Sequence, residues 1–142
     1  MSVTVLEKVA LCVSGLTAVG VGVAILAAPH SFFASYGIAV GNDPSLLSEL
    51  RAPAAGLAAF GVLILLGIWR TSITPMSKDV ALIVFLAFPA GRLIGLIVDG
   101  LPSGPIIGAL VFELAVAALC IVAFSRRSKP VQAQFSDPRT EH

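Results

Sequence analysis

Four long apolar runs divide the chain, and polar or turn-forming residues separate them. The runs cover residues 9–28, 47–69, 80–98 and 106–124. Each is close to the roughly 20 apolar residues that a transmembrane helix needs. Short loops place consecutive helices side by side in opposite directions. The pattern therefore predicts an all-α fold, a four-transmembrane-helix antiparallel bundle formed by residues 1–125 as one membrane domain.

The segments between the runs carry clear turn and boundary signals. Asp43 is suited to cap the second helix, and Pro44 fits its first position. A glycine- and proline-rich turn over residues 99–105 reverses the chain between the last two runs. Residues 29–42 connect the first two runs and carry three aromatic side chains on one side, which we interpret as a marker of the membrane–water interface: Phe32, Phe33 and Tyr36.

Composition supports a membrane protein and weakens several other classes. Hydrophobic residues make up 57% of the chain and charged residues only 12%, whereas a soluble domain has about 25% charged residues. The net charge of +1 gives no sign of a nucleic-acid partner. Cys12 and Cys120 lie inside apolar runs and are interpreted as small hydrophobic residues. Residues 126–142 form a polar tail that we expect to be disordered.

The distribution of basic residues predicts how the bundle lies in the membrane. Arg51 is the only basic residue at one interface, while the other side of a four-span topology holds Lys8, Arg70, Lys78, Arg126, Arg127, Lys129 and Arg139. The positive-inside rule then places both termini in the cytoplasm, with the protein in the cell inner membrane. A cleaved signal peptide is the alternative for the first run, but that run is longer than the 7–15 residues of a typical signal core.

An arginine inside the third run is the most informative single residue. Arg92 at mid-helix costs roughly 2.5–3.5 kcal/mol on insertion scales, so it needs a partner or a function. Glu113 is the only charge in the fourth run. Arg92 and Glu113 lie equally far from the centre of the intervening turn, between Pro102 and Ser103, so an antiparallel hairpin places them at the same depth. We therefore expect an Arg92–Glu113 ion pair.

Three further charges are expected in the same outer half of the bundle. Glu49 and Arg51 lie two residues apart, roughly 200° around a helix, so they cannot pair with each other. Pro53 leaves the carbonyl of Glu49 without its helical donor and should kink the second helix there. Asp99 shares a helix face with Arg92 because it follows seven residues later. The candidate site is thus a polar cluster of Glu49, Arg51, Arg92, Asp99 and Glu113.

The cluster is open to four interpretations. Its three carboxylates and two guanidiniums sum to −1, which a proton, a cation or a positively charged ligand would balance. It is a network that locks helices together, a site for a small amphiphilic or lipid-like ligand, a catalytic centre acting on a lipid- or isoprenoid-like substrate with Glu113 or Glu49 as acid or base, or part of a transport path. Ligand binding is the leading functional hypothesis.

Cofactors, metals and partners are constrained by what the runs contain. They hold no histidine or methionine that would serve as a haem ligand, and no metal-binding or nucleotide-binding motif is present. We expect no cofactor, with membrane lipid as the surroundings. Small residues recur every four positions in two runs, which favours close helix packing and a homo-oligomer: Ser14, Ala18 and Gly22, then Ala87, Gly91 and Gly95.

Several segments together resemble a known bacterial membrane family. They are Pro29–Ile38, Glu49–Ala52, Gly91–Pro102 and Glu113–Leu114. Over roughly residues 5–125 the chain is similar to the family known as domain of unknown function 4345. The resemblance implies a four-helix inner-membrane protein and brings no established activity. The architecture is also similar to that of DoxX-like membrane proteins, but architecture does not determine function.

Overall fold

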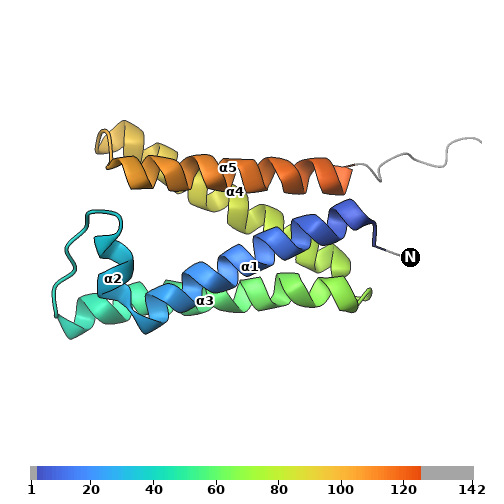
Figure 1. The fold of residues 1–142 in the computed structure, drawn as a ribbon, viewed down its shortest axis with the longest axis horizontal. Coiled ribbons are helices and arrows are strands. Elements are labelled where there is room, and N and C mark those ends of the chain that lie inside the picture. The colour runs from blue at the N-terminus through green and yellow to red at the C-terminus, as the bar shows by residue number, and fades with distance from the viewer. Residues whose placement is uncertain (1–2, 126–142) are drawn as a thin grey trace, which may run out of the picture.

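The computed structural model describes residues 3–125, which form five helices (Figure 1). These are α1 (Val5–Ala27), α2 (Pro29–Ala34), α3 (Pro44–Trp69), α4 (Thr74–Val98) and α5 (Gly104–Ser125). All but the short α2 are long and apolar enough to cross a membrane. The predicted all-α fold with four membrane-spanning helices is therefore confirmed. The predicted polar tail lies outside the described residues.

Local sequence signals explain where the long helices begin. Asp43 caps α3 as predicted, because its side chain accepts a hydrogen bond of 3.0 Å from the backbone N–H of Leu46. At α1, Thr4 and Glu7 form a reciprocal capping box. This cap starts α1 at Val5, before the apolar run begins. The caps thus extend the helices into the polar ends of the bundle.

Helices α1 and α3 pack closely because small residues face each other between them. A methyl group added to Gly22 would lie 2.6 Å from the backbone oxygen of Ala54, which shows how near the two backbones are. Ser14, Ala18 and Gly22 are all buried. This predicted small-residue stripe therefore packs inside one chain. The second stripe differs, since Ala87 and Gly91 are exposed, and the homo-oligomer stays a prediction.

The four long helices cross instead of running in parallel. Helix α1 packs on α3 and α5, and α4 packs on the same two helices. In Figure 1, α1 runs from beside α3 up toward α5, while α4 behind it descends from α5 toward α3. At one end of the bundle, α1 and α3 consequently diverge from α4 and α5 (Figure 1). That end contains α2 and the α4–α5 turn, and it is called the α2 end below.

Candidate functional site

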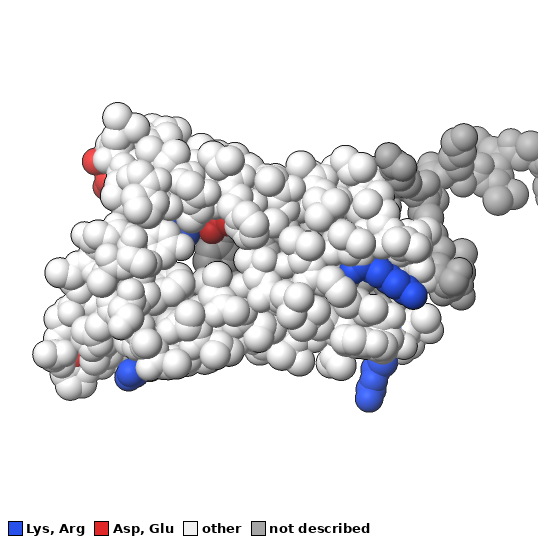
Figure 2. Space-filling model, viewed as in Figure 1, with Lys and Arg blue, Asp and Glu red and all other residues white. Residues whose placement is uncertain are grey.

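A cavity of about 530 Å³ lies in the α2 end of the bundle. This volume falls within the range of roughly 300–1,000 Å³ that small-molecule sites occupy. Figure 2 shows one face of the molecule as almost wholly uncharged, with acidic and basic atoms visible beside a hollow. Every helix contributes to the lining: Thr17, Ala18, Val21, Ile25, Phe32, Phe33, Tyr36, Leu50, Pro53, Ala54, Leu57, Val84, Phe85, Phe88, Arg92, Pro105, Gly108, Ala109, Phe112 and Glu113.

An ion pair between Arg92 and Glu113 forms the polar part of this wall. Nε of Arg92 lies 3.0 Å from Oε2 and 3.2 Å from Oε1 of Glu113. The arginine side chain is 30% exposed and the glutamate side chain 14%. This is the contact that the symmetry of the α4–α5 turn predicts. The pair offsets the cost of placing either charge alone in apolar surroundings.

The guanidinium of Arg92 has hydrogen-bonding capacity beyond this pair. Both of its hydrogen bonds to described residues come from Nε. An arginine carries further N–H donors on its two terminal nitrogens. Because the side chain lines the cavity and is partly exposed, those donors are accessible to water or to a ligand.

The other three residues of the predicted cluster do not line the cavity. Arg51 is exposed and donates a hydrogen bond of 3.3 Å from Nε to the backbone oxygen of Leu26. Glu49 and Asp99 are exposed and form no ion pair within residues 3–125. The structure thus brings together Arg92 and Glu113 and separates the remaining charges from them. The charge sum of −1 expected for five residues becomes zero for the two that line the cavity.

The geometry of α3 explains why its charges are excluded. Leu50, Pro53, Ala54 and Leu57 line the cavity, and their spacing of three, four and seven residues defines one face of a helix. Glu49 and Arg51 flank this face, are exposed, and do not belong to the lining. Pro53 lies inside α3 and belongs to the cavity wall, and the predicted kink stays a prediction. The sequence analysis assigned the charged residues of this segment to the site and did not identify the apolar face that lines the cavity.

Aromatic side chains of α2 and of the turn that follows it form a second part of the wall. The ring centroids of Phe32 and Phe33 lie 5.4 Å apart, and those of Phe32 and Tyr36 lie 5.2 Å apart. Ser103 in the α4–α5 turn donates a hydrogen bond of 2.8 Å to the backbone oxygen of Tyr36. Interpreting these aromatics only as interface markers missed their place in the cavity. Their shared side, noted in the sequence, was the available signal.

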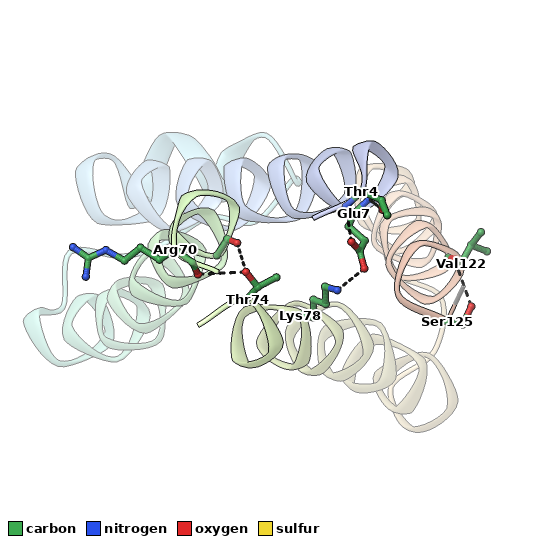
Figure 3. Close-up of polar contacts among 8 residues, drawn as sticks. Thr4, Glu7, Arg70, Thr74, Lys78, Val122 and Ser125 are labelled. Carbon is green, nitrogen blue, oxygen red and sulfur yellow. Dashed lines mark hydrogen bonds and ion pairs between the residues drawn. The ribbon is translucent and has the colours of Figure 1, made fainter. Parts of the chain in front are cut away.

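A second ion pair, which the sequence did not reveal, lies at the opposite end of the bundle. Figure 3 shows Glu7 of α1 and Lys78 of α4 pointing toward each other across the helix interface. Glu7 is fully buried, and its carboxylate also accepts a hydrogen bond from the backbone N–H of Thr4. The ammonium of Lys78 lies 5.6 Å from the ring centroid of Phe124 in α5. Three long helices therefore meet at this pair.

Comparison with known proteins places the chain in a family without assigning an activity. A family model matches residues 6–124, which is most of the chain. A comparison with curated proteins finds no match, and neither does a comparison with solved structures. The similarity to DoxX-like proteins stays a prediction. The four apolar helices indicate a multi-pass membrane protein, and the chain belongs to the family described as domain of unknown function DUF4345.

Proposed function

We propose that this protein binds a small amphiphilic, lipid-like molecule in the cavity at the α2 end. The observation that carries the proposal is the composition of the wall: apolar and aromatic side chains surround a single ion pair, Arg92–Glu113. Sites for small molecules combine an apolar lining with a few placed polar groups in this way. An amphiphile matches both parts, because its chain contacts the apolar wall and its head contacts the pair.

A purely structural role for the ion pair is the main alternative. An ion pair that only holds α4 against α5 needs no space beside it, since protein interiors are normally packed to high density. Here the pair borders a cavity of about 530 Å³. It also leaves the terminal nitrogens of Arg92 without a partner among the described residues. Both features favour ligand binding over helix locking alone.

The proposal includes an orientation in the cell inner membrane. The end of the bundle opposite α2 carries Lys8, Arg70 and Lys78. At the α2 end the described basic residues are the exposed Arg51 and the partly exposed Arg92, and Arg92 is paired with Glu113 inside the cavity wall. The positive-inside rule favours a cytoplasmic location for the more basic end. The cavity then lies on the outer side of the membrane. A ligand would reach it from the outer leaflet or from the space beyond.

Filling the cavity should remove the ligand without removing a charge. Gly108 lines the cavity, and a Cβ atom at this position would meet no atom within 4 Å, so Gly108→Leu adds a bulky side chain where space exists. Gly20 in α1 is exposed and equally unobstructed but does not line the cavity. Gly20→Leu is therefore the matched control. We expect at least a tenfold loss of bound ligand in Gly108→Leu. The added side chain excludes apolar contact between ligand and wall, and burial of an apolar group of that size contributes about 1.5–3 kcal/mol.

Native mass spectrometry of protein extracted gently from its own membrane measures this effect. The proposal predicts a discrete bound mass in the wild type and in Gly20→Leu, strongly reduced in Gly108→Leu. Equal retention of that mass in all three proteins would place the ligand elsewhere and contradict the proposal. Absence of any bound mass from a stable wild-type protein would favour the structural role.

A further inference from the structure

We infer that the cavity selects a neutral amphiphile whose head group is a hydrogen-bond acceptor, such as an ester or ketone carbonyl. This inference rests on the proposed function, and it specifies the class of ligand that the site takes. Three features of the lining lead to it. They are its charge balance, the donors left on Arg92 and the volume beside the aromatic wall.

The charge balance of the lining disfavours a charged head group. Among the described residues, Arg92 and Glu113 are the only ones in the lining that carry a formal charge at neutral pH, and their charges sum to zero. The two charges are already neutralised by direct contact between Nε and both carboxylate oxygens. A ligand with a net charge would add an uncompensated charge to apolar surroundings, which is strongly unfavourable. A neutral head leaves the balance intact.

The hydrogen-bonding capacity of the pair points to an acceptor on the ligand. Both carboxylate oxygens of Glu113 already accept hydrogen bonds from Nε of Arg92. The terminal nitrogens of Arg92 retain their N–H groups, and a guanidinium has no acceptor to offer. Arg92 therefore presents free N–H donors to a ligand in the cavity, beside the hydroxyl group of Tyr36. A carbonyl oxygen satisfies these donors, and a hydrogen bond to a charged group contributes more to binding than one between neutral groups.

The size and surface of the cavity favour a ligand with a single hydrocarbon chain. Its volume of about 530 Å³ lies in the lower half of the range of small-molecule sites. Phe32 and Phe33 of α2 and Phe85 and Phe88 of α4 supply flat apolar surfaces to the lining. Such a space suits one alkyl or isoprenoid-like chain better than the two chains of a membrane phospholipid. The head group and the chain together describe a neutral, single-chain amphiphile.

Three probes with similar alkyl chains and different heads test this inference: methyl decanoate, decanoate and decylamine. Each is titrated calorimetrically into the full-length protein in lipid nanodiscs. Subtracting the heat measured with Gly108→Leu removes partitioning into the lipid. We expect the wild type to bind methyl decanoate about tenfold or more tightly than either charged probe, because an unbalanced buried charge outweighs a single hydrogen bond.

Two single substitutions should change this preference in opposite directions. Glu113→Gln leaves the positive charge of Arg92 unbalanced, so decanoate should become the tightest probe. Arg92→Gln leaves the negative charge of Glu113 unbalanced, so decylamine should become the tightest. An unchanged order of affinities in both variants would overturn the inference. Should either variant fail to fold, the wild-type order still decides, since a preference for decanoate or decylamine contradicts a neutral ligand.

The same experiment separates failure of the inference from failure of the proposed function. If no probe binds the wild type above the Gly108→Leu background, the cavity is not an amphiphile site and the proposed function fails. If probes bind and Gly108→Leu abolishes binding, the proposed function stands. In that case a wild-type preference for a charged head refutes the neutral class alone.

Discussion

Gly61→Ala is expected to destabilise the bundle, whereas the same change at Gly56 on the same helix should not. A methyl carbon at Gly61 would lie 2.6 Å from the backbone nitrogen of Val19 and 2.8 Å from the backbone oxygen of Gly15. Backbone atoms cannot rotate away as a side chain does, so α1 and α3 must separate. Overpacking typically costs about 1–3 kcal/mol, and we expect a value at the upper end.

Gly56→Ala provides a control with the opposite sign. A Cβ atom at Gly56 would meet nothing within 4 Å, and alanine is favoured over glycine in a helix by roughly 0.5–1 kcal/mol. Unfolding of the protein in detergent micelles by sodium dodecyl sulfate, followed by circular dichroism, measures both changes. Equal stability of the two variants would show that the α1–α3 backbones are not as close as described.

Lys78→Met should produce the second large loss of stability. It removes the positive charge that pairs with the carboxylate of Glu7, a residue that is 0% exposed. Removing one partner of a buried ion pair costs about 3–5 kcal/mol. Because Lys78 is partly exposed, the lower end of this range is expected. The same change also removes the cation from the ring of Phe124, and so weakens the link between α4 and α5.

Two further variants test whether the charge itself is responsible. Lys8→Met changes an exposed lysine next to Glu7 in the chain and should alter the free energy of unfolding by no more than about 0.5 kcal/mol. Adding Glu7→Gln to Lys78→Met should restore part of the loss, because the buried carboxylate is then uncharged. A Lys78→Met protein as stable as Lys8→Met would contradict the importance of this pair.

The Arg92–Glu113 contact was predictable because it joins consecutive helices. When a short turn connects two helices of equal rise, residues equidistant from the turn lie at the same depth. Only the positions of the two charges and of the turn are needed. The beginning of α3 was predictable for a similar reason, because Asp43 and Pro44 determine it through local capping. Features of this kind depend on short-range geometry, which the sequence contains.

The Glu7–Lys78 pair was not predictable in this way. It joins α1 to α4, and their relative placement depends on how all the long helices cross. The predicted five-residue cluster failed to assemble for a related reason. Glu49 and Asp99 lie in the same half of the bundle as the ion pair, but Asp99 caps the end of α4, about 10 Å beyond Arg92 along the helix axis. For Glu49, sharing a half of the bundle does not specify the direction of a side chain around its helix. The apolar face of α3, beginning at Leu50, determines that direction.

Photo-crosslinking within the native membrane tests the central claim most directly. Phe112 and Phe60 are each 49% exposed, but only Phe112 lines the cavity. Each is replaced in turn by the photoreactive p-benzoylphenylalanine, and the adducts formed on illumination of intact membranes are identified by mass spectrometry. We predict a discrete neutral, single-chain adduct at Phe112 that is absent at Phe60, where bulk phospholipid should dominate. The same mixture of phospholipid adducts at both positions would contradict a selective ligand site in the cavity.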